Sequence, residues 1–111
     1  MDPLNAYRQA IERVLTVYTQ IPYAHGELRC EALFDREHDR YALVTVGWNA
    51  GQRVHFVLVH IDLLGDKVWI EKDNTEDGVA PELVEAGIPK AHIVLGFRSP
   101  ELRKHTEYAV A

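Results

Sequence analysis

The sequence predicts a single α+β domain with an N-terminal helix, a four-stranded antiparallel meander and short C-terminal helices. Three observations support this prediction: apolar residues recur at helical spacing near the N-terminus, four β-branched-rich runs follow across short turns, and the last third holds helix start and stop signals. With 111 residues, 47% hydrophobic and 26% charged, the chain has the length and composition of one globular domain over residues 1–111.

The first helix is predicted from about Pro3 to Thr19. Asp2 is a suitable N-cap, and Pro3 suits the first helical position because the N–H that it lacks has no intrahelical partner there. Apolar side chains then recur every three or four residues and share one face. They are Leu4, Tyr7, Ile11, Val14, Leu15 and Tyr18. Pro22 and Gly26 mark the end of this helix.

Four strand-like runs follow, at residues 27–35, 40–48, 53–64 and 67–73. They are separated by "REHD", "NAGQ" and "GD", which are turn-type sequences. Connections this short join only antiparallel neighbours, so the runs predict a meander. The second and third runs are apolar on both sides of the pleat, whereas a sheet with one wet face alternates apolar with polar. We therefore expect the first helix to cover one face, and the C-terminal third or a second subunit, as in a homo-oligomer, to cover the other.

The stretch "DNTEDG" after the fourth run invites three interpretations: a metal-binding loop, an acid cluster or the start of a helix. Against the EF-hand pattern, Asp73, Asp77 and Gly78 match the first, fifth and sixth places, but Thr75 stands third and Val84 twelfth. Without a carboxylate at the twelfth place, the loop has too few oxygen ligands for tight calcium binding. We interpret it as a helix-capping loop.

The helix that this loop opens lies in "VAPELVEAGIP". Asp77 or Thr75 is expected to cap it, and Pro81 must lie in its first turn, because deeper in the helix Pro removes a hydrogen bond. Gly87 fits a left-handed stop, after which Ile88 packs back onto the helix.

Complete catalytic motifs are not found: the sequence has no HExxH, P-loop, GxGxxG or GxSxG pattern. His60 and Asp62 share a strand face, and a metal-dependent hydrolase would have to combine them with Asp73 and Asp77. Cys30 is the only cysteine, so no internal disulfide forms, which is typical of a reducing cytosol. We expect a cytoplasmic non-enzyme without catalytic residues, cofactor or metal, and without a signal peptide or membrane span.

The final "SPELRKHTEYAVA" opens with Ser99, which is predicted to cap a short helix. Arg98, Arg103, Lys104 and His105 form the densest basic cluster of a chain whose net charge is −5. One interpretation is a solvated helix whose dipole favours cations near its C-terminal end. The other is a contact site for an acidic partner or a phosphate backbone, although the net charge disfavours free-standing nucleic-acid binding. The last residues could also add to a sheet edge.

"LVTVGW", "VHIDLLGDKVWIEKDNTEDGVAPELVEAGIPKAHIVLGF" and "SPELRKHTEYAVA" resemble the XisI proteins, which are called excision controlling factors of a cyanobacterial DNA element. The resemblance extends along nearly the whole chain, and "TEDG", "LVEAGIPK", "IVLGF" and "RKHTE" occur in the family's order and spacing. It implies an XisI-like domain with an accessory role in programmed, site-specific excision by a separate recombinase. It also implies a companion, XisH, that is nuclease-like in character, and it brings no established catalytic residue.

From the residues and the resemblance together we expect a non-enzymatic regulatory subunit that binds an XisH-like partner, and also itself. Three alternatives stay open. The chain could be a DNA-binding specificity factor that uses Arg98, Arg103 and Lys104 against phosphates, an antitoxin-like inhibitor of the nuclease-like partner, or the metal-dependent hydrolase described above.

Overall fold

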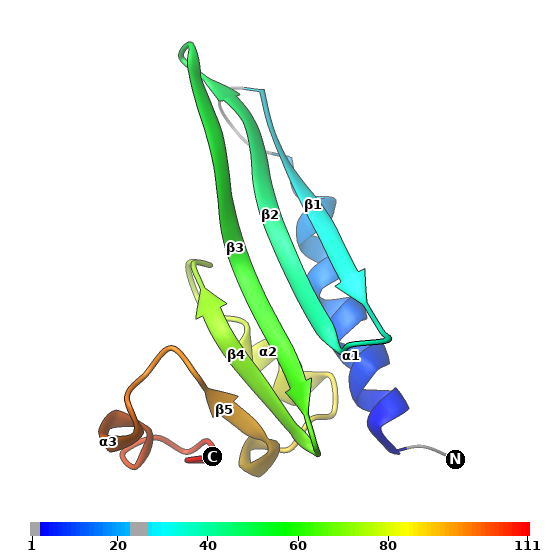
Figure 1. Cartoon of the computed structure of the whole chain (residues 1–111), viewed down its shortest axis with the longest axis vertical. Coiled ribbons are helices and arrows are strands. Elements are labelled where there is room, and N and C mark those ends of the chain that lie inside the picture. The colour runs from blue at the N-terminus through cyan, green and yellow to red at the C-terminus, as the bar shows by residue number, and fades with distance from the viewer. Residues whose placement is uncertain (1–2, 23–26) are drawn as a thin grey trace.

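A computed structural model of the chain describes residues 3–22 and 27–111, and shows a five-stranded sheet with its two longer helices on one face (Figure 1). The elements in chain order are α1 (Pro3–Thr19), β1 (Glu27–Asp35), β2 (Arg40–Asn49), β3 (Gln52–Leu64), β4 (Lys67–Asp73), α2 (Ala80–Glu85), the 3₁₀ turn η1 (Lys90–His92), β5 (Ile93–Leu95) and α3 (Pro100–Arg103). The strand order in the sheet is β1-β2-β3-β4-β5.

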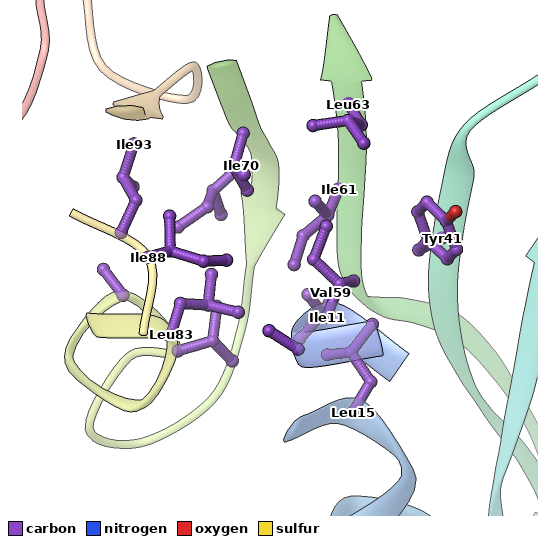
Figure 2. Close-up of a cluster of buried hydrophobic side chains, with 14 of the residues drawn as sticks. Ile11, Leu15, Tyr41, Val59, Ile61, Leu63, Ile70, Leu83, Ile88 and Ile93 are labelled. Carbon is purple, nitrogen blue, oxygen red and sulfur yellow. The ribbon is translucent and has the colours of Figure 1, made fainter. Parts of the chain in front are cut away.

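Helix α1 has the predicted bounds, Pro3–Thr19, while Asp2 and Gly26, its expected start and stop residues, lie outside the described residues. Its apolar face packs on the sheet as the periodicity predicts. Ile11 and Leu15 are fully buried, and Figure 2 shows them beside Val59 and Ile61 of β3. Burial of large aliphatic side chains of this kind contributes about 1.5–3 kcal/mol each, so α1 and the central strands stabilise one another.

The antiparallel meander β1 to β4 is confirmed in order and direction. The prediction of four strands is wrong, because a fifth strand, β5, pairs in parallel with β4. Ile93 and Val94 of this strand are fully buried. A parallel pair needs a crossover connection, and here α2 is that crossover. Three residues are too short a run for strand periodicity to be recognised in the sequence.

The loop before α2 is held by a different residue from the one predicted. The N-cap position is Val79, which makes no side-chain capping bond, so neither Thr75 nor Asp77 caps the helix. The N–H of Val79 donates instead to Oδ2 of Asp73 at 2.8 Å, and the N–H of Thr75 donates to Oδ1 of Asp73 at 3.0 Å. Gly78 turns the chain with a φ of 81°. The capping carboxylate thus comes from the end of β4, six residues upstream, beyond the reach of local capping rules.

The end of α2 follows the predicted pattern. Gly87 has a φ of 110°, its N–H donates to the carbonyl of Val84, and the N–H of Ile88 donates to the carbonyl of Leu83. These two bonds form a Schellman stop. Leu83 and Ile88 are both buried and lie side by side in Figure 2. The predicted cap of α3 is also confirmed, since the side chain of Ser99 accepts from the N–H of Leu102.

Replacing Asp73 with Ala should lower the free energy of unfolding by about 2–4 kcal/mol, because the buried Val79 N–H would lose its charged acceptor. The matched control is Asp77→Ala, which removes the expected cap but none of the described hydrogen bonds of this loop, and should change stability by less than about 0.5 kcal/mol. Urea denaturation measures both. Equal losses in the two variants would contradict the role of Asp73.

Gly47 lies in β2, close against the backbone of Glu27 and Leu28 in β1. A Cβ there would overlap the carbonyl oxygen of Glu27, and the residue has a φ of 150°. Gly47→Ala should therefore push β1 away from β2 and lower the thermal midpoint strongly. Gly51→Ala is the control, since Gly51 also has a positive φ but no heavy atom within 4 Å of the added Cβ. We expect Gly47→Ala to cost at least about 2 kcal/mol more than Gly51→Ala.

Candidate functional site

The face of the sheet opposite α1, here called the open face, is uncovered over β1 and β2 within the described chain. Tyr41 and Leu43 of β2 belong to the buried cluster, so the residues that alternate with them point away from α1. Strand pairing places Leu33 of β1 beside Ala42, and Val57 of β3 beside Val44. In Figure 1, α1 and α2 lie behind the sheet and no described element lies in front of β1 and β2.

The open face carries exposed apolar side chains on an otherwise charged surface. Leu33 is 58% exposed and Trp48 is 50% exposed, while Val44 and Val46 between them are nearly buried by their neighbours in the sheet. The guanidinium carbon of Arg53 lies 5.4 Å from the centre of the Trp48 ring, a cation–π distance. A large aromatic and an aliphatic side chain flanking a β-branched floor form the type of patch that marks a protein contact.

The C-terminal third covers this face only at one end, and cover of the rest by a second subunit stays a prediction. At the covered end the guanidinium carbon of Arg103, in α3, lies 5.2 Å from the centre of the Trp69 ring of β4. The last residues also add to the sheet, since Ala109 forms a parallel bridge with Val94, as the sequence suggested they could. Neither contact reaches Leu33 or Trp48, so the part over β1 and β2 stays open within the described chain.

A polar cluster of Arg40, His60, Asp62 and Glu71 lies on the same face, between the part that stays open and the part that the C-terminal residues cover. His60 Nε2 lies 2.8 Å from Oδ1 of Asp62, which confirms that these two residues share a face, and Nε of Arg40 lies 3.4 Å from the same oxygen. Asp62 is buried. Burial, followed by a hydrogen bond to Asp62 and the charge of that residue, raises the pKa of Glu71 above its usual value. The neutral form of Glu71 is therefore favoured over its charged form more than it would be in water.

A hollow of about 490 Å³ adjoins the cluster on the β1–β2 side. Leu33, Ala42, Arg40 and His60 contribute to its lining, so its wall combines apolar side chains with two that donate hydrogen bonds. This composition suits the insertion of one amphipathic side chain from a partner protein.

The residues considered for a hydrolase are not brought together. Asp73 pairs with Val59, whose side chain is in the core, whereas His60 pairs with Lys72, so Asp73 and His60 point to opposite faces of the sheet. Among residues 3–22 and 27–111, no three His, Cys, Asp or Glu side chains are grouped so that they could hold a metal ion. Within the same ranges, no helix has the length and apolarity needed to cross a membrane.

The four basic residues of the C-terminal segment have different roles. Arg103 donates to the backbone carbonyls of Leu95, Gly96, Arg98 and Val110, at 3.2, 3.4, 3.0 and 3.2 Å. Its guanidinium thus links the last residues of the chain to the end of β5 by hydrogen bonds. Arg98 stacks on Phe97, Lys104 pairs with Glu101 at 3.2 Å, and His105 is exposed. Arg98, Lys104 and His105 therefore remain exposed to solvent, while Arg103 is engaged inside the molecule.

Sequence reasoning located His60 and Asp62 but missed the other parts of this site. Arg40 and Glu71 meet Asp62 from neighbouring strands: Arg40 pairs directly with Asp62, and Glu71 follows the core residue Ile70 and so points to the open face. Trp48 and Leu33 were present in the predicted strands; the apolar character of the second strand on both sides of its pleat marks Trp48, whereas no such signal marks Leu33 of the first strand.

Replacing Glu71 with Gln should stabilise the protein at pH 7. Because the folded state raises the pKa of Glu71, its charged form costs stability above that pKa, and the cost disappears as the pH falls below the unfolded-state value. The gain in thermal midpoint should therefore be present at pH 7 and vanish by about pH 3. Glu37→Gln, at an exposed turn position, is the control and should leave the midpoint unchanged. A gain for Glu71→Gln that does not depend on pH would contradict this account.

The chain is similar to known proteins over nearly its whole length. The profile of the XisI protein family matches residues 1–110. A solved XisI-like protein from Anabaena variabilis ATCC 29413 superposes with a TM-score of 0.85 at 31% identity, over 97% of this chain and 99% of that chain. The fdxN element excision controlling factor XisI from the same organism superposes with a TM-score of 0.81 at 32% identity, over 99% of this chain and 100% of that chain. A search of curated proteins found no match.

The family resemblance first noted in the strands, the α2 loop and the C-terminal segment is thus shown at the level of both sequence and fold. The profile match and the two superpositions each extend over nearly the full length of the described chain. This protein belongs to the XisI family.

Proposed function

We propose that this protein is a non-enzymatic accessory factor that controls the programmed excision of a DNA element, and that it acts by binding an XisH-like protein through its open face. The family, and the relative described as an fdxN element excision controlling factor, support a role in the control of excision. The cutting and joining of DNA strands is then the work of a separate recombinase, and this chain contributes a contact.

The observation that carries this proposal is the pair of exposed apolar side chains, Trp48 and Leu33, on strands whose other face is packed against α1. A rigid sheet presents such side chains in a fixed geometry, so little conformational entropy is lost when a partner binds. Tryptophan is among the residues that contribute most to binding energy at protein interfaces. The partner's apolar surface would cover the Val44 and Val46 floor, and Arg53 would lie at the rim.

The polar cluster suits the edge of such an interface. His60 and Arg40 lie beside the hollow, where their N–H groups can donate to carbonyls or carboxylates of the partner. Asp62 already has these two residues as partners, so the binding of another protein does not leave its buried carboxylate unpaired. On β1 the exposed ion pair of Arg29 and Glu31, at 2.9 Å, lies opposite Val46 and Val44. The open face therefore offers a partner both apolar side chains and charged ones.

The net charge of −5 favours a second form of the same proposal. A nuclease-like partner needs a basic surface for nucleic acid, and an acidic protein is attracted to such a surface. Bound there, this chain would act as an inhibitor in the manner of an antitoxin. Helper and inhibitor differ in their effect on the cell, so producing the XisH-like protein alone and together with this chain, while following growth and DNA integrity, distinguishes them.

The test of the open face is co-purification of this chain with the XisH-like protein. The variant Leu33→Ser/Trp48→Ser should raise the dissociation constant about tenfold to hundredfold, because two apolar anchors are lost. The control is Phe56→Ser, which changes a side chain that is 41% exposed but lies one position from Val57 and so points to the opposite face. Calorimetry or light scattering on mixed samples gives the constants.

Three results would overturn the proposal. The wild-type chain could fail to bind the XisH-like protein at micromolar concentration, the double variant could bind as tightly as the wild type, or the Phe56 control could lose as much affinity as the double variant. Circular dichroism of all three chains confirms that any loss comes from the surface and not from unfolding.

A further inference from the structure

A second surface lies on the helix side of the molecule, between the end of α1 and the loop that precedes α2. It is a groove of about 640 Å³. Val14, Val17 and Ile21 line it on the α1 side, and Val17 and Ile21 are each 54% exposed. Across the groove, the hydroxyl of Tyr18 donates to the carboxylate of Glu82, which ties α1 to α2 and gives the groove a fixed shape.

The groove has a strongly acidic rim. Four carboxylate residues line it, namely Glu76, Asp77, Glu82 and Glu85. Arg13 is the one basic residue among its described lining residues, and its guanidinium donates to the carbonyl of Ala86. An apolar wall under an unbalanced negative rim favours a segment that carries both apolar and positively charged side chains.

This chain itself contains such a segment. Residues 97–105, here called the C-terminal segment, present Phe97 and Leu102 to solvent, and Leu102 is 53% exposed. Arg98, Lys104 and His105 are exposed in the same stretch. The segment also holds Glu101, which pairs with Lys104 at 3.2 Å, so its exposed cations exceed its one carboxylate. The groove and the C-terminal segment are thus both partly apolar, and their net charges are opposite.

The C-terminal segment is held away from the groove of its own chain. Arg103 fastens it to the carbonyls of Leu95, Gly96 and Val110, at the β5 end of the sheet. Figure 1 shows α3 beyond β5, whereas α1 lies behind β1 and β2 at the other side of the sheet. A contact between the two surfaces must therefore join two molecules.

We propose that the C-terminal segment of one copy of this protein binds the acidic groove of a second copy. Arg98 and Lys104 would face the carboxylates of Glu76, Asp77 and Glu85. Phe97 and Leu102 would cover Val17 and Ile21. If two copies exchange these contacts reciprocally, they form a closed two-fold dimer, and if the contacts run head to tail, they form a longer assembly.

This self-association goes beyond the proposed function, because the groove is on the helix side and leaves the open face free for another protein. It also assigns a use to the exposed basic residues that does not depend on DNA. The two surfaces can be tested separately, since the Leu33→Ser/Trp48→Ser variant should leave self-association unchanged.

Charge reversal on each side of the contact tests the proposal. The groove variant is Glu76→Lys/Asp77→Lys/Glu85→Lys, and the segment variant is Arg98→Glu/Lys104→Glu. Each variant alone sets like charges opposite each other, so its self-association should be at least about tenfold weaker than that of the wild type. A chain that carries all five changes has complementary charges again, and it should associate like the wild type.

Analytical ultracentrifugation from about 1 to 100 μM measures the association, at low and at high salt because exposed charge pairs are screened by salt. The expected result is that the wild type associates less tightly as salt rises, that the groove variant and the segment variant each associate more weakly, and that the variant with all five changes associates like the wild type. Three results would each overturn the proposal. The wild type could be monomeric, the two charge-reversal variants could associate as the wild type does, or the variant with all five changes could stay monomeric although its circular dichroism matches that of the wild type. Rescue is decisive because a nonspecific loss of folding cannot produce it.

Discussion

The carboxylate of Asp73 determines the course of the last third of this chain. At the end of β4 it accepts hydrogen bonds from the N–H groups of Thr75 and Val79, and so sets the direction in which the chain turns back. Helix α2 then lies on the same side of the sheet as α1, where Leu83 and Ile88 complete the core. The crossover also delivers β5 in parallel beside β4. One partly buried carboxylate thus links the meander to everything after it.

A consequence is that both longer helices cover one face only, and the molecule is flat. Its extents are 44 × 35 × 23 Å, with a radius of gyration of 14.7 Å, against about 13 Å for a compact domain of this length. Strand β3 has 13 residues, but β4 pairs only with residues 59–64 of it. The rest of β3, with β1 and β2, forms an arm whose open face displays Trp48 and Leu33. The flat shape is therefore what exposes the candidate contact surface.

The candidate site was predictable where a single strand determines it. His60 and Asp62 are two residues apart in a strand, so the period of two places them on one face, and the structure confirms it. Arg40 and Glu71 reach Asp62 from neighbouring strands, which depends on a cross-strand register that the pattern of one strand does not show. Arg103 illustrates the same point. Its sequence neighbours place it in a basic cluster, but its guanidinium donates hydrogen bonds to the carbonyls of Leu95 and Val110.

Taken by itself, the sequence determined the elements whose causes lie within a few residues. They are α1 with its apolar face, the four meander strands, the Gly87 stop and the Ser99 cap, which depend on periodicity, turn residues and local hydrogen bonds. Only the tertiary structure decided that β5 pairs with β4, that Asp73 replaces the local caps of α2, and that one face stays open. The physical reason is that each of these outcomes depends on contacts between residues that are distant in the sequence. Chain closure and packing bring such residues together, and no local sequence pattern specifies which residues become partners.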